Sequence, residues 1–175
     1  MPTAVVETLL EVAPVFANFS EQDRKDILEV AVEETYAPEM EIVSRGTAAR
    51  SMYVVAEGTV EILESSDFDE HTVLGTLIPP CTFGELPFFE RTDHAVTVRT
   101  ITPVRVLSIE RSGFDRLLER QSIAAYKLAL NVLLKLGEQM RRIDEWIDQE
   151  LIRSDPTRQE VWAEFRAKLY QGREI

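Results

Sequence analysis

The chain has 175 residues, of which 45% are hydrophobic and 29% are charged, and its formal net charge is −12. This is the composition of an ordinary globular protein, with enough apolar residues to build a core. Because so acidic a chain repels nucleic-acid phosphates and anionic lipid, we expect neither nucleic acid nor a membrane as its partner.

The chain has one cysteine, Cys81, which excludes an internal disulfide and a multi-cysteine metal site. Residues 1–14 lack the basic start and the long apolar core of a secretory signal. No run approaches the roughly 18 apolar residues that a membrane-spanning helix needs. We therefore expect a cytoplasmic protein.

The first part of the chain has helical periodicity. The apolar residues of the first helix crowd one face: Val5, Val6, Leu9, Leu10 and Val12. Ser20 is placed to cap a second helix, which Pro38 is expected to end. The buried stripe of this second helix is predicted to be Ile27, Leu28, Val30 and Ala31.

From about residue 40 the hydrophobic period changes to two, which is typical of strands. Six or seven short β-rich runs follow, with Gly and Pro turns between them. The clearest are residues 40–42, 52–55, 60–63, 73–78, 95–100 and 104–109. This pattern predicts a small antiparallel β-barrel of jelly-roll type.

After Ile109 the pattern returns to helix. Ser112 is predicted to cap a short helix, and a long helix is predicted from about Ser122 to Arg153. The apolar stripe of the long helix is Leu133, Leu136, Met140, Ile143, Ile147 and Leu151. A small barrel cannot cover so long a stripe, so we expect it to contact a second copy, another protein or the chain's own tail.

Asp155 and Pro156 predict a break and the start of a last helix, lined by Val161, Trp162, Phe165 and Leu169. The expected fold class is therefore α+β: a jelly-roll-like antiparallel barrel with N-terminal helices and a long C-terminal helix. We expect residues 1–121 to form the barrel unit. Residues 122–175 then contain the long helix and the short terminal one.

Several motifs occur along this order of elements. They are Val15-Phe16 before the capped helix, YVVAEG at residues 53–58, FGEL at residues 83–86, AVTV at residues 95–98, and Ile109, Arg111, Phe114, Leu117 and Leu118. Together, over roughly residues 9–150, they resemble the cyclic-nucleotide-binding domain of the catabolite-activator and protein-kinase regulatory-subunit type. The chain looks like a stand-alone member without a helix-turn-helix.

The resemblance implies a ligand site at Gly84, Glu85, Leu86, His94 and Ala95. In the family, the glycine lets the backbone approach the ligand, and the glutamate accepts a hydrogen bond from the ribose 2′-hydroxyl. Backbone N–H groups at the start of a short helix and an arginine hold the cyclic phosphate. Gly84, Glu85 and Ala95 match this pattern.

Two positions depart from the family pattern. His94 stands where the family has its arginine, and Pro87 has no N–H to give to the phosphate. Losing one charged and one neutral hydrogen bond costs about 2.5–4 kcal/mol, on the order of 100- to 1,000-fold in affinity. Arg91 is a candidate substitute for the phosphate contact. We therefore expect cAMP or cGMP to bind weakly, and we expect no other cofactor and no metal.

The electrostatic field of the residues around the site also disfavours the binding of an anion. Residues 57–93 contain one arginine, Arg91, and no lysine. Their acidic residues are Glu57, Glu61, Glu64, Asp67, Asp69, Glu70, Glu85, Glu90 and Asp93. Although many of these side chains are expected to point to solvent, the sign of their charge disfavours phosphate.

Other interpretations of the same residues remain open. Glu85 either binds ribose or stabilises the N-terminus of a short helix. His94 is a weakened phosphate contact, a surface loop histidine or a pH-dependent group. Phe88 and Phe89 pack in the core or form a lid over a base.

No catalytic motif supports an enzyme: the chain has two histidines, His71 and His94, and neither a nucleophile elbow nor a phosphate loop. The tail 156–175 is nearly balanced in charge, which does not favour DNA binding. The preferred hypothesis is a non-catalytic cyclic-nucleotide sensor that signals through its C-terminal helix as a homodimer or to a partner protein. The alternative is a ligand-free interaction or dimerisation module on the same fold.

Overall fold

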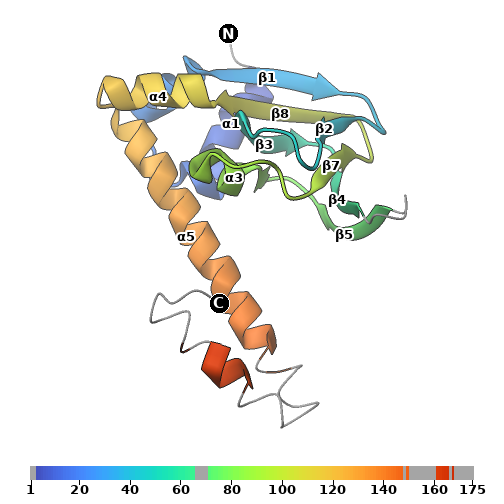
Figure 1. The fold of residues 1–175 in the computed structure, drawn as a ribbon. Helices are drawn as coiled ribbons and strands as arrows, with labels where there is room; N and C mark the ends of the chain where they lie inside the picture. The colour runs from blue at the N-terminus through green and yellow to red at the C-terminus, as the bar shows by residue number, and fades with distance from the viewer. Residues whose placement is uncertain (1–2, 66–70, 148, 150–160, 166, 168–175) are drawn as a thin grey trace. The chain divides into compact units, whose positions relative to one another are not determined.

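The computed structural model describes residues 3–65, 71–147, 149, 161–165 and 167 (Figure 1). The chain divides into two compact units, Met1–Val132 and Leu133–Ile175, and each is described by itself. The boundary between these units lies within one long helix. The domain division expected at residues 121 and 122 stays a prediction.

The N-terminal segment is helical. It consists of α1 (Ala4–Val12), the 3-10 turn η1 (Pro14–Phe16) and α2 (Glu21–Leu28). The predicted cap of α2 is confirmed, because the Asp23 N–H donates to Ser20 Oγ at 3.2 Å. In return, the Ser20 N–H donates to the Asp23 carboxylate at 2.7 Å, which completes a capping box.

Two antiparallel four-stranded sheets follow in the described part of the chain. Their strands are β1 (Ala31–Tyr36), β2 (Glu41–Val43), β3 (Ser51–Glu57), β4 (Val60–Ser65), β5 (His71–Leu77), β6 (Cys81–Phe83), β7 (Thr97–Thr100) and β8 (Val104–Glu110). The strand order is β1-β8-β3-β6 in the first sheet and β2-β7-β4-β5 in the second. With the flanking helices, this arrangement confirms the predicted α+β fold class.

Two of these strands were not predicted. The expected helix through Val30 and Ala31 to Pro38 is wrong: α2 ends at Leu28, and β1 begins at Ala31. β1 pairs with β8 over its whole length, and this long-range pairing overrides the weak local pattern of AVEETY. The short strand β6 likewise exists because Cys81–Phe83 pairs with β3.

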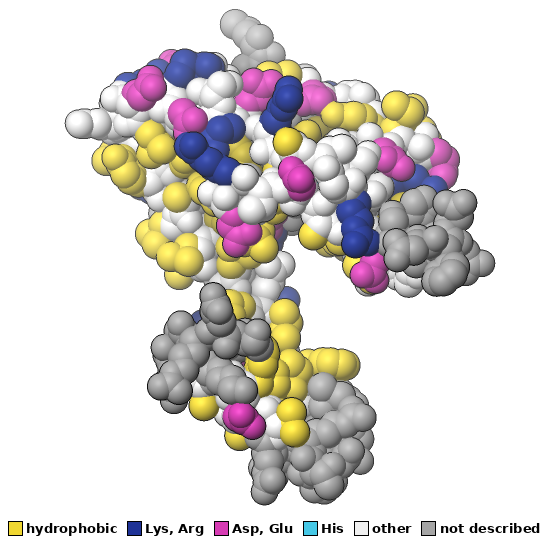
Figure 2. All heavy atoms as spheres, in the orientation of Figure 1, with side chains coloured by type: hydrophobic (Ala, Val, Ile, Leu, Met, Phe, Trp, Pro, Cys, Tyr) yellow, Lys and Arg dark blue, Asp and Glu magenta, His cyan; other side chains and the backbone are white. Residues whose placement is uncertain are grey.

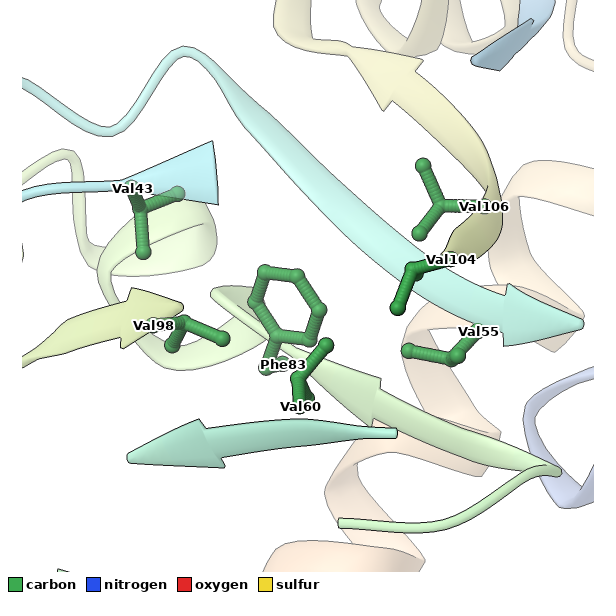
Figure 3. Packing of buried hydrophobic residues seen from close by; sticks show 7 residues of the cluster. All are labelled: Val43, Val55, Val60, Phe83, Val98, Val104 and Val106. Carbon is green, nitrogen blue, oxygen red and sulfur yellow. The ribbon is translucent and has the colours of Figure 1, made fainter. Parts of the chain in front are cut away.

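β8 is buried on both of its faces. Val106 lies opposite Val55, and directly opposite residues of antiparallel strands share a face. This face belongs to the barrel core shown in Figure 3, which consists of Val43, Val55, Val60, Phe83, Val98, Val104 and Val106. The alternate residues Leu107 and Ile109 are buried on the other face, where α4 contacts β8.

Three helices follow the two sheets or connect their strands: α3 (Glu85–Glu90), α4 (Arg111–Glu119) and α5 (Ile123–Trp146). The predicted Ser112 cap is wrong, because Glu110 is the N-cap of α4 and the Ser112 hydroxyl donates to its carboxylate. Within the first unit, α5 is held to the N-terminal segment. The Lys127 ammonium lies 2.6 Å from the Asp23 carboxylate, and the Asn131 amide donates to the Val15 carbonyl at 3.0 Å.

The second unit begins at Leu133 on α5. Of the predicted apolar stripe, Leu133, Met140 and Ile143 are exposed, while Leu136 and Ile147 are half-buried. Figure 2 shows hydrophobic side chains gathered along this part of the helix. Residues 161–165 are helical, and the Trp162 ring stacks on Phe165 at 5.1 Å between centroids. Leu151, Arg153, Asp155, Pro156 and Leu169 lie outside the described residues.

Gly58, in the turn between β3 and β4, provides a test of this packing. Its φ is +88°, and a Cβ at this position would lie 2.2 Å from the Pro103 carbonyl oxygen. We therefore expect Gly58→Ala to destabilise the fold by about 3 kcal/mol or more, because backbone strain adds to a steric clash. Gly75→Ala is the matched control, since a Cβ there has nothing within 4 Å, and it should cost about 1 kcal/mol or less. Urea unfolding measures both, and similar losses in the two variants would contradict this packing.

Candidate functional site

The predicted site is centred on the turn between β6 and α3. Gly84 has a φ of +75°, a left-handed conformation that favours glycine. A Cβ on Gly84 would lie 3.3 Å from the Ser51 carbonyl oxygen, 3.4 Å from His94 Cε1 and 3.7 Å from Tyr53 Cδ2. We call Gly84, Glu85, His94 and these neighbours, Ser51 and Tyr53, the Gly84 site. A Cβ would nearly fit among these groups, so it is mainly the left-handed φ of +75° that favours glycine at this turn.

The helix that follows presents its N-terminus at this turn. Glu85 is buried in the first turn of α3, whereas Leu86 is exposed. The Phe88 N–H donates back to the Gly84 carbonyl at 3.1 Å, so it takes part in the helix. Pro87 has no N–H, as the sequence requires, and the helix therefore offers one donor fewer at its start.

His94 is buried, with 7% of its surface exposed, so its interpretation as a surface loop histidine is wrong. Its backbone is fixed by the turn between β2 and β3. The His94 N–H donates to the Thr47 carbonyl at 2.9 Å, and the His94 carbonyl accepts from the Gly46 N–H at 2.8 Å. Only the long-range contact with residues 46 and 47 reveals this burial, and the local sequence contains no signal for it.

Burial lowers the pKa of the His94 imidazole below its ordinary value of 6.5, and the Asp93 carboxylate opposes this shift. The ring is therefore neutral at physiological pH and carries one donor and one acceptor. A neutral imidazole does not supply the positive charge that the family's arginine brings to a phosphate.

The remaining predicted residues lie at the edges of the site. Ala95 is exposed between His94 and β7. Arg91 ends α3 with a φ of +61°, and its exposed guanidinium lies 4.0 Å from the Asp115 carboxylate on α4. The described contact of Arg91 is thus with α4, and its role toward a ligand remains a prediction.

Phe88 packs in the core, which is one of the two roles expected for it. Its ring is fully buried and lies edge-on against Phe114.

Arg111, at the start of α4, has a structural role that the sequence motif did not indicate. Its guanidinium donates to the Phe88 and Phe89 carbonyls and lies 4.5 Å from the centre of the Phe88 ring. Arg111 thereby satisfies the carbonyl end of α3, which positive groups stabilise, and holds the helix in place.

The barrel interior beside the site is apolar. The Tyr53 and Phe83 rings stack at 5.0 Å between centroids, and Phe83 belongs to the barrel core. Two of the acids in residues 57–93 are paired with arginines, Glu61 with Arg99 at 2.6 Å and Glu57 with Arg105 at 3.0 Å. Figure 2 shows acidic and basic side chains interspersed over the sheets on the visible face. The acidic field predicted from the sequence is therefore partly cancelled.

Neither a metal-binding cluster nor a membrane-spanning helix is found in the part of the chain that the structure describes. No group of three or more His, Cys, Asp or Glu residues there is arranged to hold a metal ion. Among the described helices, none has both the length and the apolar composition to cross a membrane.

The chain belongs to the cyclic nucleotide-binding domain family, whose family model matches residues 33–121. It is similar to the cAMP-dependent protein kinase regulatory subunit of Schizosaccharomyces pombe, with 25% identity over 151 residues. That match covers 86% of this chain and 34% of the relative. The chain spans about a third of the length of the curated relatives that it matches.

Solved structures show the same fold. The catabolite activator protein of Thermus thermophilus matches with a TM-score of 0.69 and 21% identity, covering 91% of this chain and 72% of that chain. The regulatory domain of Toxoplasma gondii PKA, in a co-crystal structure with cAMP, matches with a TM-score of 0.58 and 20% identity. This second match covers 64% of this chain and 42% of that chain. The family and the fold predicted from the sequence are confirmed.

The burial of His94 predicts how stability depends on pH. Because its pKa is lowered in the folded state, the stability that the neutral ring contributes is complete above the ordinary value of 6.5 and is lost as the pH falls below it. From about pH 7.5 to pH 5.5, the wild-type chain should therefore lose more unfolding free energy than His94→Gln, which cannot be protonated. Urea unfolding at both pH values measures this, and equal losses would contradict the buried, neutral state.

Proposed function

We propose that this chain is a non-catalytic regulatory protein that senses a small ligand at the Gly84 site and signals through its C-terminal helix. The observation that carries the proposal is the close approach of Ser51, Tyr53 and His94 around a left-handed Gly84, inside the region that matches the family. The relatives named above are a protein kinase regulatory subunit and a catabolite activator protein, and their names support a regulatory role without catalysis.

The ligand is a cyclic nucleotide, cAMP or cGMP, held with low affinity. One relative in the solved structures carries cAMP, which supports this ligand class. Gly84, Glu85, Leu86, His94 and Ala95 form the contact surface. The neutral ring of His94 and the missing N–H of Pro87 weaken the grip on phosphate.

The output passes through α5 to a second copy of this chain or to a partner protein. The exposed apolar side chains of Leu133, Met140 and Ile143 support this, because water-exposed apolar groups at helical spacing favour association. The same exposed side chains support the alternative function, a ligand-free interaction module. Nucleic acid and membranes are not among the proposed partners, and the proposed location is the cytoplasm.

Restoring the family pattern tests the ligand. We expect the wild-type chain to bind cAMP weakly and the double variant Pro87→Ala/His94→Arg to bind it on the order of 100- to 1,000-fold more tightly. The gain comes from one N–H and one positive charge directed at the phosphate. Calorimetric titration measures the affinity, and thermal shift covers binding with little heat.

The control for this experiment is Pro87→Ala/His94→Gln, which restores the N–H without the charge and should recover only the smaller part of the affinity. Micromolar binding of cAMP by the wild-type chain would show that other donors, Arg91 first among them, hold the phosphate. If Pro87→Ala/His94→Arg shows no cAMP binding by calorimetry or by thermal shift, the sensor function is overturned. The ligand-free interaction module is then the function that stands.

Association through α5 gives a second test. We expect the wild-type chain to form homodimers in analytical ultracentrifugation, and Met140→Glu to weaken them by about tenfold or more, because it places a charge in the apolar stripe. Gln139→Glu adds the same charge at a neighbouring exposed position and should leave association unchanged. A wild-type chain that stays monomeric at every concentration would direct the search to a different partner protein.

A further inference from the structure

The start of α5 supplies hydrogen-bond donors to the turn between η1 and α2. The Lys127 ammonium donates to the Asn18 carbonyl at 2.8 Å. One turn further along α5, the Asn131 amide donates to the Val15 and Ala17 carbonyls, each at 3.0 Å. Three backbone acceptors of this turn are therefore satisfied by side chains of a helix that is far away in the sequence.

One oxygen atom joins the cap of α2 to α5. Asp23 Oδ2 accepts from the Ser20 N–H and from the Ser20 hydroxyl, both at 2.7 Å, and from the Lys127 ammonium at 2.6 Å. Burial opposes the charged form of this carboxyl, but the bonds from Lys127 and Ser20 outweigh it and hold the pKa of Asp23 below its ordinary value of 3.8. The carboxylate that completes the capping box is thus the same one that holds α5.

These donors lie beside a buried face of α5. The buried residues of this face, spaced four apart, are Ala124, Leu128 and Val132. The Asp23 side chain is only 6% exposed, so a chain without the Lys127 ammonium would keep a shielded carboxylate without its cation. Because such a group is costly, the capping box and the docking of α5 stabilise each other.

We infer that Lys127 and Asn131 make the fold of residues 15–23 conditional on the docking of α5, so that the N-terminal segment loosens when the start of α5 is displaced. This coupling goes beyond the function proposed above, because it needs no ligand. If α5 carries an output, the N-terminal segment responds to the same displacement and is a second element that a partner can recognise.

Amide hydrogen exchange of the full chain, followed residue by residue by NMR, tests this coupling. Lys127→Met removes the ammonium and keeps an unbranched stem. We expect the Ser20 and Asp23 amides, which are bonded in the capping box, to exchange about tenfold or more faster, measured relative to the amides of β8.

Asn131→Leu is an independent second variant, because it removes the donors to two carbonyls at similar volume. It should accelerate the Ala17 and Phe19 amides relative to β8. These amides close the turn by donating to the Pro14 and Phe16 carbonyls, at 3.1 and 3.3 Å.

Lys25→Met is the matched control. It removes a contact of the same length, 2.6 Å to the Glu21 carboxylate, but within α2 and between two exposed side chains. Because exposed ion pairs contribute little, the Ser20 and Asp23 amides should accelerate by about threefold or less.

Three contrary results would each overturn the coupling. Equal acceleration of the N-terminal segment and β8 would show a general loss of stability. Unchanged Ser20 and Asp23 amides in Lys127→Met would show that α2 is capped independently of α5, and an equally large effect of Lys25→Met would show that any lost charge pair has this result. None of these results decides the sensor function, which cAMP binding by Pro87→Ala/His94→Arg tests separately.

Discussion

The pairing of β8 with two neighbours at once is the constraint on which the structure depends. This strand lies between β1 and β3, and both pairings are antiparallel. Its alternate side chains enter two different cores: Val104 and Val106 face the barrel interior, while Leu107 and Ile109 lie on the opposite face. A slip of one residue would exchange the two sets. Because both sets are apolar, the register depends on the fit of each side chain in its own core rather than on an apolar and a polar face.

The same strand leads directly into the part of the molecule that holds the site. Arg111 follows β8, and its guanidinium donates to the carbonyl end of α3, whose other end begins at Gly84. The site is thus held from two sides. The turn at Thr47 fixes the backbone of His94, and the start of α4 fixes the helix that carries Glu85.

The parts of the fold that sequence could predict are those with a strong local signal. Ser20 is a recognisable cap, and the valine-rich run in β3 alternates clearly. The local pattern before Pro38 predicts helix, whereas AVEETY forms β1, because its conformation comes from its pairing with β8 rather than from its own pattern. For the site, the FGEL motif located Gly84 and Glu85. The burial of His94 and the contact of Arg111 with α3 arise from pairs of residues far apart in the chain, so no local pattern contains them.

The way His94 is anchored has an evolutionary consequence. Both of its backbone groups are bonded to the turn at residues 46 and 47, and these bonds involve no side-chain atom. An exchange between histidine and arginine at this position therefore keeps both of them. A lineage of this fold can thus change the chemistry of position 94 by one substitution while the backbone anchor of that position is retained.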